Sequence, residues 1–400
     1  MRVAFTRNSD PELAARQCGA ALAEGGGTPS LLMVFCGGKL DPRRVRASLV
    51  AQFGPVPLVG GAAAGAISRT GLGYSGFELG VIGFFDPAMT PRIMTVRDLD
   101  AGVFEAGATL GAAVRDMIAA PAVVLLLFDS VASSLPPRLH HASSIVAGFS
   151  EGVGDAPACL LGGGLLTDMN LTDAWVFDGE GVSKHSAVAL VFPPDIVAET
   201  VILHGCRPVS AFMEITRIEG AEVFELDGEP ALAVIERMLG LRLGGARGQE
   251  LSLLATLGEK QGDLFAPYDE NAYVNRLILR ANPETGSVTL FEPDFARGSH
   301  VQIMSRDNTL MLDSVRRGVA ELMRKIAGRE NLFALYIDCA GRASVRSGAP
   351  VEEAELVLHG MDPALPFLGF YSGVEIAPFN GEHSKPLDWT GVLTVLQRRR

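Results

Sequence analysis

The same order of elements occurs three times along the sequence, and this repetition restricts the fold more than any other feature. Each time, an apolar run of strand length is followed by a polar turn, a helix-length segment and a short second strand containing glycine. The first strands are predicted at Leu31–Phe35, Val123–Phe128 and Leu332–Ile337. A further apolar strand closes each copy, at residues 77–84, 187–192 and 391–396. Apolar runs separated by helices are typical of βαβ units with buried strands. The sequence therefore predicts an α/β fold of repeated strand–helix–strand units, whose sheets are flanked by helices.

The glycine content also follows this repeat. Glycine accounts for 46 of the 400 residues, yet 48% of the chain is apolar, which excludes a disordered protein. Each second strand is predicted to end on glycine, at Gly60, Gly61, Gly163 and Gly369. In α/β sheets, ligands bind beyond the carboxyl ends of parallel strands, where glycine lets backbone come close. These four glycines are therefore candidate ligand-binding positions; the alternative is that they only permit tight packing and turns.

The pattern changes between the second and third copies. Residues 230–239 are predicted to form a helix, because proline stands in the first turn and glycine follows the last. A longer helix is predicted at residues 308–326, and residues 286–291 and 300–304 are predicted to form a strand pair. A domain boundary is expected near residue 230.

Charge and hydropathy exclude several classes of partner. The chain has 34 Lys and Arg against 46 Asp and Glu, a net charge of −12. Without a basic stripe, nucleic acid and anionic membranes are not expected partners. No segment has the ~20 apolar residues of a spanning helix, and the start lacks a signal-peptide core. Five dispersed cysteines without a CxxC pair fit a reducing compartment. A soluble cytoplasmic protein is expected.

Two glycine-containing segments resemble nucleotide-binding motifs in sequence, but their spacing or the elements around them do not fit such motifs. Residues 71–76 spell GxGxxG, but the dinucleotide-binding form needs a helix directly after it. A strand follows here, so a hairpin loop is predicted. Residues 37–39, Gly-Gly-Lys, lack the spacing of a P-loop. A strand-to-helix turn is predicted there.

A third motif, GxSxG at residues 148–152, raises the possibility of a hydrolase. Ser150, Asp178 and His185 stand in the chain order of an α/β-hydrolase triad. A nucleophile elbow requires strand, sharp turn and helix, whereas residues 138–147 are predicted to be helical. A loop serine is favoured, and a serine hydrolase using Ser150 is kept as an alternative. The seven histidines show no HxH or HExxH spacing, so no metal site is expected.

Several segments resemble the FIST family of sensory proteins. The N-terminal half contains GCRP and ELDG-x-PAL motifs in the family's order, within residues 204–209 and 224–232, after a glycine-rich segment at residues 58–65. In the C-terminal half, the similar segments are Asn271–Arg276, Gly298–Val301, Cys339–Arg342 and Pro366–Pro378. The resemblance covers nearly the whole chain. It implies a two-domain architecture, with an N-terminal domain at residues 28–228 and a C-terminal domain at residues 229–396.

This resemblance implies a function in bacterial signal transduction. The chain is expected to be a non-enzymatic intracellular sensor that binds a small molecule, such as an amino acid. It would act through a separate partner, such as a histidine kinase or another signalling protein. Arg207 is the candidate contact for a ligand carboxylate or phosphate, because its planar guanidinium pairs such groups bidentately; a structural salt bridge is the alternative. Glu375 is the candidate for a ligand amine, and Asn271, Tyr371 and Ser372 are candidates for other polar contacts.

A haem-based sensor is another alternative. Some FIST proteins bind haem, sense nitric oxide and regulate a histidine kinase, and haem needs an axial His or Cys in an apolar pocket. The family's usual Leu-His-Asn-like segment before a Thr reads Leu387-Asp388-Trp389-Thr390 here. The missing histidine argues against haem.

Overall fold

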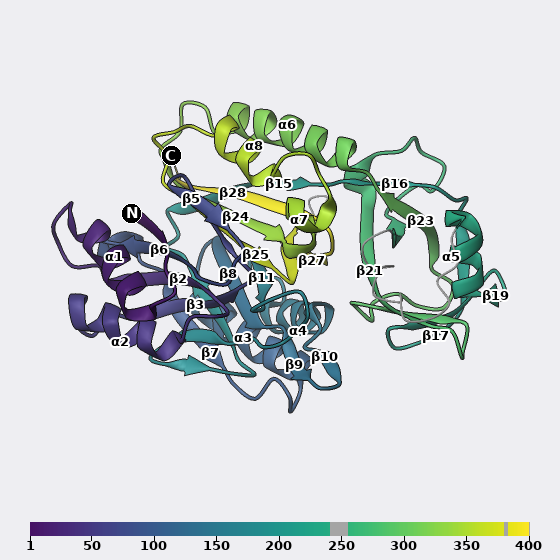
Figure 1. The fold of residues 1–400 in the computed structure, drawn as a ribbon, viewed down its shortest axis with the longest axis horizontal. Helices are drawn as coiled ribbons and strands as arrows, with labels where there is room; N and C mark the ends of the chain where they lie inside the picture. Colours follow the sequence, from purple (N-terminus) through teal and green to yellow (C-terminus); the bar gives the residue numbers. More distant parts are fainter. Residues whose placement is uncertain (241–254, 380–382, 400) are drawn as a thin grey trace.

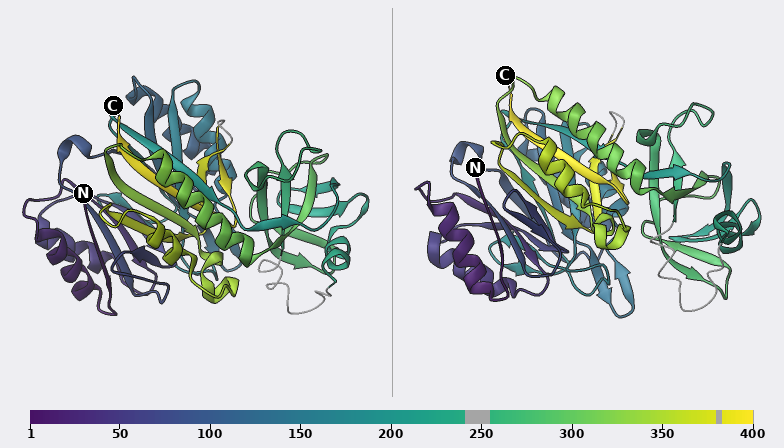
Figure 2. Two further views of the ribbon diagram at one scale, coloured as in Figure 1. Left: turned by 90° about the horizontal axis from the view of Figure 1, so that it is seen from above. Right: turned by 45° about the horizontal axis from the view of Figure 1, so that its top comes forward.

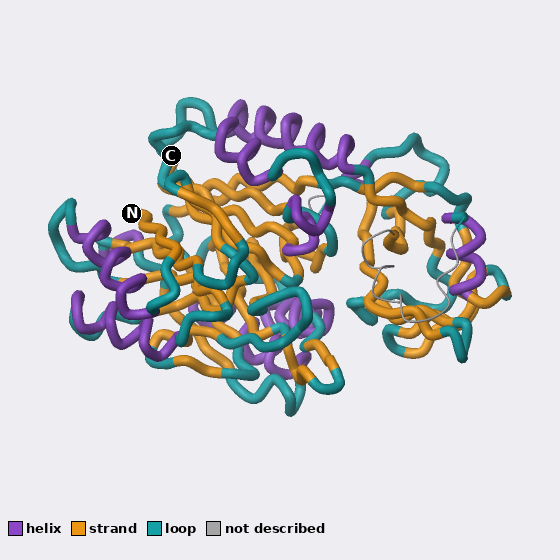
Figure 3. Tube along the Cα trace, viewed as in Figure 1, coloured by secondary structure: helices purple, strands orange, loops and turns teal. Residues whose placement is uncertain are grey.

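The computed structural model describes residues 1–240, 255–379 and 383–399. These residues form two lobes, which lie side by side in Figure 1. The described part of the larger lobe has three six-stranded sheets and one two-stranded sheet, with helices on its outside, and the smaller lobe consists mainly of antiparallel strands. The additional views in Figure 2 show the same two lobes, and Figure 3 shows that strands dominate both. Both chain termini lie in the larger lobe.

Three copies of one strand–helix unit build the larger lobe. The first consists of β1 (Arg2–Arg7), α1 (Pro11–Ala23), β2 (Leu31–Gly37), α2 (Pro42–Phe53), β3 (Leu58–Ala63), β4 (Ala66–Ser68), β5 (Gly71–Gly73) and β6 (Glu78–Phe84). The second consists of β7 (Arg92–Val96), α3 (Val103–Met117), β8 (Ala122–Asp129), β9 (Val131–Ser134), β10 (Pro137–Leu139), α4 (Ala142–Val153), β11 (Ala158–Leu165), β12 (Val176–Gly179), β13 (Val182–Ser183) and β14 (Ala187–Val191). The third consists of β15 (Ile196–Leu203), α6 (Asn308–Lys325), β24 (Asn331–Cys339), α7 (Ser344–Ser347), α8 (Glu353–Gly360), β25 (Phe367–Ser372), β26 (Val374–Pro378), β27 (Ser384–Leu387) and β28 (Gly391–Arg398).

Strand pairing is the same in all three units. The two central strands run parallel: β2 with β3, β8 with β11, and β24 with β25. The closing strand, β6, β14 or β28, pairs antiparallel with the first of them. The unit's opening strand, β1, β7 or β15, then pairs with the closing strand. The predicted α/β fold of repeated units is confirmed.

Each sheet is completed by a hairpin that another unit supplies. Strand β12 of the second unit pairs with β3 of the first. Strand β26 of the third unit pairs with β11 of the second, and β4 of the first unit pairs with β25 of the third. Each unit therefore gives one hairpin to another unit and receives one in return from a different unit, so the exchange forms a closed ring of three.

One buried apolar cluster joins the three units. Phe35 of the first, Leu125 of the second and Ile337 of the third belong to one buried cluster. The rings of Phe35 and Phe370 stack with their centroids 4.0 Å apart, which links the first unit directly to the third. Burial of one such side chain contributes about 1.5–3 kcal/mol, so no unit keeps its share of the core without the others.

The smaller lobe is inserted into the third unit, between β15 and α6. It contains β16 (Cys206–Pro208), β17 (Met213–Glu219), β18 (Glu222–Leu226), β19 (Glu229–Pro230), α5 (Ala231–Leu239), β20 (Ala255–Lys260), β21 (Tyr273–Asn282), β22 (Ser287–Leu290) and β23 (His300–Arg306). Strand β23 pairs with both β17 and β20, which closes the sheet into a barrel. Because β15 and β28 are neighbours, the sheet of the third unit contains strands from both sides of the insertion.

Some sequence predictions need correction. The expected pair of residues 286–291 with residues 300–304 is wrong: β22 pairs with β18 and β21, whereas β23 lies on the other side of the barrel. The helix expected at residues 138–147 begins only at Ala142, because residues 137–139 pair with β9 in a short hairpin. The helices predicted at residues 230–239 and 308–326 are confirmed as α5 and α6. None of the described helices has the length and apolar character needed to cross a membrane.

Candidate functional site

A pocket of about 640 Å³ lies at the carboxyl ends of the parallel strands. All three units contribute to it. The first unit supplies the segments that follow β2 and β3, the second supplies the segment after β11, and the third supplies the segment after β24 and the end of β25. Its lining residues include Gly38, Lys39, Ala64, Thr167, Ala340 and Tyr371. In α/β sheets this is the edge at which ligands bind, because the turns that leave the strands supply free polar groups. We call this cavity the strand-end pocket.

The charges of the strand-end pocket that have no ion-pair partner among the described residues are positive on balance. Lys39 and Arg346 both line it, and neither has an ion-pair partner among the residues that the structure describes. Of the acidic residues, Asp173 pairs with Lys184. Asp168 accepts hydrogen bonds from Asn170 and Thr172 of its own turn through Oδ1 and has no cation partner among the described residues. The pocket therefore favours a ligand that carries negative charge.

Tyr371 links the strand-end pocket to a buried network behind it. Its ring lines the pocket, and its hydroxyl donates a hydrogen bond to Oε1 of Glu352 at 2.9 Å. The other oxygen of Glu352 accepts from the backbone N–H of Ser344, also at 2.9 Å. Ser344 begins α7, the short helix that carries Arg346. A contact at Arg346 is thus connected to strand β25 through one carboxylate.

The buried network is centred on Arg342. This guanidinium donates to both carboxylate oxygens of Glu353, at 3.0 and 2.8 Å, and to the carbonyl oxygen of Trp389 at 3.0 Å. Asp338 lies 3.5 Å from it and is also fully buried. Burial raises the pKa of Asp338 well above its ordinary value. A charge held this far from water depends on its partners.

Ser372 and Glu375, both predicted as ligand contacts, lie inside this region and face protein. Glu375 is fully buried, and its two oxygens are hydrogen-bonded by Ser372 at 2.6 Å and Thr390 at 3.0 Å. Burial raises the pKa of Glu375 to about 8. The single Ser372 hydroxyl hydrogen faces two acceptors, Glu375 and the Asp338 carbonyl at 3.1 Å. A protonated Glu375 resolves this conflict, because it donates to Ser372 while Ser372 donates to Asp338.

We predict that Glu375→Gln removes part of the pH dependence of stability. The folded chain keeps a proton on Glu375 up to about pH 8, whereas the unfolded chain releases it near the ordinary value of 4.5. Wild-type stability therefore falls as pH rises through this window. Glutamine copies the protonated acid and does not titrate, so the fall should be smaller. Urea unfolding at about pH 5 and about pH 8 measures it, with exposed Glu24→Gln as control. An unchanged slope would contradict the assignment.

The predicted glycines lie within the strands rather than at their ends, and their neighbours are protein backbone. A Cβ at Gly60 would lie 2.2 Å from the carbonyl oxygen of the paired residue on β2, and a Cβ at Gly369 2.7 Å from its counterpart on β24. Gly61 and Gly163 face strands from other units, with carbonyl oxygens 2.3 and 3.0 Å from the Cβ position. None of these four glycines lines the strand-end pocket.

Arg207 and Asn271 lie on the inserted segment and also do not line the strand-end pocket. Arg207 of β16 forms an ion pair with Asp307 at 3.2 Å and remains largely exposed. The side chain of Asn271 donates to Asp269 at 3.0 Å within its own turn. A ligand contact by either residue stays a prediction.

The GxSxG motif packs two helices together. Ser150 lies within α4, which lacks the strand–turn–helix geometry of a nucleophile elbow. Glycines 148 and 152 let α4 approach α3, since a Cβ at either would lie 2.0 or 2.1 Å from a carbonyl oxygen of α3. Asp178 forms an ion pair with Arg97, and His185 faces Asp100 and His140. The three supposed triad members therefore have separate partners.

Haem does not fit the residues present. His204 is 1% exposed and neither ring nitrogen has a hydrogen-bond partner among the described residues. However, His204 lines neither the strand-end pocket nor two smaller pockets, of about 400 and 340 Å³. The smallest pocket holds His383 and Cys159, and its volume is near the lower limit of ordinary small-molecule sites. A macrocycle needs more room, so we derive no role for haem.

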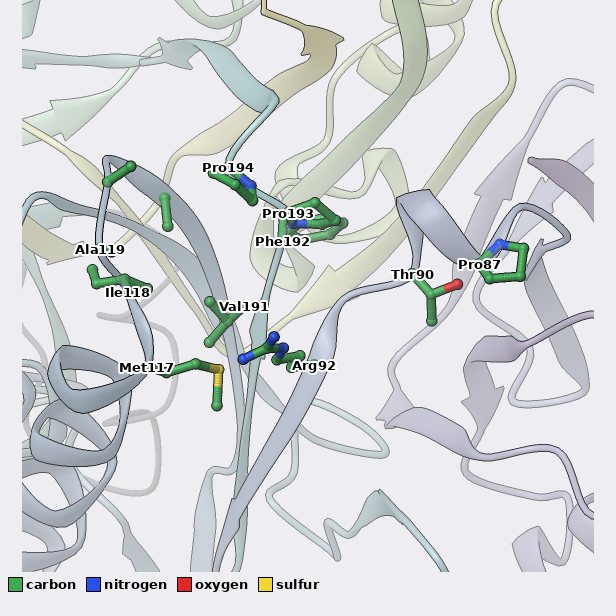
Figure 4. Close-up of a pocket in the computed structure, with 12 residues that line it drawn as sticks. Pro87, Thr90, Arg92, Met117, Ile118, Ala119, Val191, Phe192, Pro193 and Pro194 are labelled. Carbon is green, nitrogen blue, oxygen red and sulfur yellow. The ribbon is translucent and has the colours of Figure 1, made fainter.

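The pocket of about 400 Å³ lies at the opposite ends of the strands of the second unit. Figure 4 shows its apolar walls, which include Met117, Ile118 and Val191, and the side chain of Arg92. Arg92 is the one charged residue among those lining it. With contributions from all three units and several polar groups, the strand-end pocket is the stronger candidate.

Sequence reasoning missed Lys39 and Arg346. Lys39 belongs to the Gly-Gly-Lys turn, whose spacing excludes a P-loop and indicates no other binding motif. Its position directly after the buried strand β2 was the available signal. Arg346 follows the buried strand β24 but lies on a short helix that no pattern indicated.

A scaffold of three α/β units with a polar pocket at the carboxyl ends of its parallel strands defines the class: a three-unit α/β protein with a candidate ligand pocket. Residues 30–229 match the FIST N domain and residues 231–378 match the FIST C domain, so the chain belongs to the FIST family. FIST domains are sensory domains of signal-transduction proteins and are regarded as binders of small ligands. The resemblance stated from the motifs is confirmed.

Similar proteins occur in mycobacteria. The chain is 27% identical over 202 residues to an uncharacterized protein of Mycobacterium bovis, covering 50% of each chain. It is 25% identical over 193 residues to one of Mycobacterium tuberculosis, covering 48% of this chain and 49% of the relative. The chain thus spans about half the length of the curated relatives it matches. A chorismatase crystal structure aligns over 99% of this chain and 97% of its own, but with 10% identity and a TM-score of 0.35 it carries no argument.

Proposed function

We propose that this chain is a non-enzymatic sensor that binds a small carboxylate, with an amino acid as the leading candidate, in the strand-end pocket. One observation carries this proposal: Lys39 and Arg346 come from different units, line one pocket and have no ion-pair partner among the described residues. A ligand carboxylate would pair with these cations through charge-assisted hydrogen bonds. An amino acid could place its ammonium near Asp168, which lines the same pocket.

The proposed signal begins at α7. A ligand that pairs with Arg346 would favour one position of this short helix, whose first N–H is held by Glu352. Glu352 also holds Tyr371 of β25. Ligand binding and the position of α7 would thereby be coupled through a defined set of contacts. The output would pass to a separate signalling protein, for which the family suggests a histidine kinase.

The pocket cations should determine affinity. We expect a panel of amino acids and small carboxylates to contain a ligand that raises the melting temperature by linkage. Lys39→Met and Arg346→Met should each weaken its binding about tenfold or more, because each removes a hydrogen bond to a charged group. Calorimetric titration at constant ionic strength measures this. Arg43→Met, which removes an exposed cation outside the pocket, is the matched control.

Two results would count against the proposal. A flat melting temperature across the whole panel would contradict a carboxylate site. Equal losses in Lys39→Met, Arg346→Met and Arg43→Met would indicate general charge attraction instead of binding in the pocket.

A further inference from the structure

Three side chains from well-separated loops of the second unit converge on one point outside the strand-end pocket. Asp100 precedes α3, His140 follows β10 and His185 precedes β14. Nε2 of His140 lies 3.0 Å from Nδ1 of His185, which lies 3.2 Å from Oδ1 of Asp100. Each residue thus offers one ligand atom, and the three atoms lie within 4.8 Å of one another.

Hydrogen bonding alone satisfies this cluster poorly. Nε2 of His140, Nδ1 of His185 and Oδ1 of Asp100 face one another, and each can offer a lone pair. A proton on Nδ1 of His185 would therefore have to be shared between two acceptors, His140 and Asp100. A cation at the centre would be bound by all three. In a tetrahedral site with bonds of ~2.1 Å, neighbouring ligand atoms are about 3.4 Å apart. The observed separations of 3.0 and 3.2 Å are close to this spacing.

The backbone around the cluster is held in place from the end of β8. The buried carboxylate of Asp129 accepts hydrogen bonds from the N–H of His185 at 2.7 Å and of Val131 at 2.9 Å. His185 adopts a left-handed conformation with φ of 48°, which is uncommon for a residue other than glycine. Such a conformation persists only where the surroundings enforce it. These contacts orient the His185 ring toward His140.

The chemistry of the cluster selects a class of metal. Two imidazoles and one carboxylate suit zinc and other first-row divalent ions, whereas magnesium and calcium prefer oxygen ligands. The His185 side chain is 33% exposed and that of Asp100 is 61% exposed, so one side is open to water. Three protein ligands leave a zinc ion a fourth coordination position for water or another ligand.

We propose that Asp100, His140 and His185 form a binding site for a divalent transition-metal ion, with an open coordination position toward solvent. The site is independent of the strand-end pocket and of the ligand proposed for it. Sequence spacing could not indicate it, because its members lie on three separate loops.

The test is Zn²⁺ titration of the tag-free full chain after treatment with a chelator. One Zn²⁺ should bind per wild-type chain. Asp100→Ala removes an exposed ligand, and His185→Asn removes a ring while keeping a residue that tolerates left-handed backbone. Each should weaken binding more than about tenfold, the smallest cost usually seen for losing even an outer-shell partner. Exposed His359→Asn should bind like wild type.

Co²⁺ substitution identifies the ligands independently of affinity. The proposed site should give visible d–d bands that are lost in Asp100→Ala and His185→Asn, while metal-free melting temperatures show that both variants remain folded. A thiolate-to-cobalt band in the near ultraviolet would place the metal on a cysteine and overturn the proposal. Failure of the wild type to bind Zn²⁺, or unchanged binding in both variants, would overturn it as well.

Discussion

A chain that ends at residue 229 is expected not to fold, although the match to the FIST N domain ends there. Truncation removes β24 to β28 and leaves β4, β11 and β15 without a neighbour that each has in the full chain. It also exposes Phe35, whose stacking partner Phe370 is lost. Unpaired edges and exposed core surface favour aggregation over folding. Circular dichroism, dye binding and an amide NMR spectrum would detect the loss of cooperative structure.

A second deletion serves as the control. Replacing residues 206–306 by a short Gly/Ser linker removes the barrel but keeps all three units. The ends of this insertion are adjacent, because Cys206 pairs with Arg306 and the N–H of Asp307 bonds to the carbonyl of Gly205 at 2.9 Å. We expect this chain to fold cooperatively with reduced stability. A dispersed NMR spectrum from the chain ending at residue 229 would show that the halves fold independently and contradict the prediction.

Arg342→Met is expected to be the most destabilising single substitution in the region behind the strand-end pocket. Arg342 and Glu353 are both 0% exposed and form a bidentate pair. Methionine fills much of the volume but leaves Glu353 without its cation. Breaking a buried pair from one side costs about 3–5 kcal/mol, a large share of a typical stability of about 5–15 kcal/mol. Urea unfolding measures the difference.

The chain provides matched controls for this substitution. Arg346→Met makes the same chemical change four residues later on an exposed side chain, and should alter stability by no more than about 0.5 kcal/mol. Adding Glu353→Gln to Arg342→Met should recover part of the loss, because the buried Glu353 carboxylate is then no longer left without its cation. A loss below about 1 kcal/mol in Arg342→Met would show that the pair does not hold this region together.

The fold was predictable where the burial of an element produces a recognisable local sequence pattern. The parallel strands are buried on both faces, so β2, β8 and β24 appear as continuous apolar runs. Proline at the start and glycine after the end made α5 readable. The hairpin exchange was not predictable, because β4 and β12 are only three and four residues long. Pairing in the barrel was missed for a related reason, since β20 and β23 meet across a long stretch of chain.

The candidate site was predictable only in its location. The rule that ligands bind at the carboxyl ends of parallel strands indicates the edge of the sheets at which the strand-end pocket lies. It does not indicate which turns meet there, because Lys39 and Arg346 belong to different units. The glycines show a related limit. Sequence reveals that the backbone at Gly60 is unusual, but not that a carbonyl of the neighbouring strand, rather than a ligand, fills the space beside it.

The circular exchange of hairpins has a consequence for synthesis of the chain on the ribosome. Strand β4 is among the first segments made, yet its partner β25 is among the last, with Ser68 opposite Leu368. Contacts between residues so distant in sequence slow folding. The nascent chain must therefore keep its early apolar strands from aggregating until the third unit emerges. Protection by chaperones during translation would matter more for this architecture than for three independent domains of the same size.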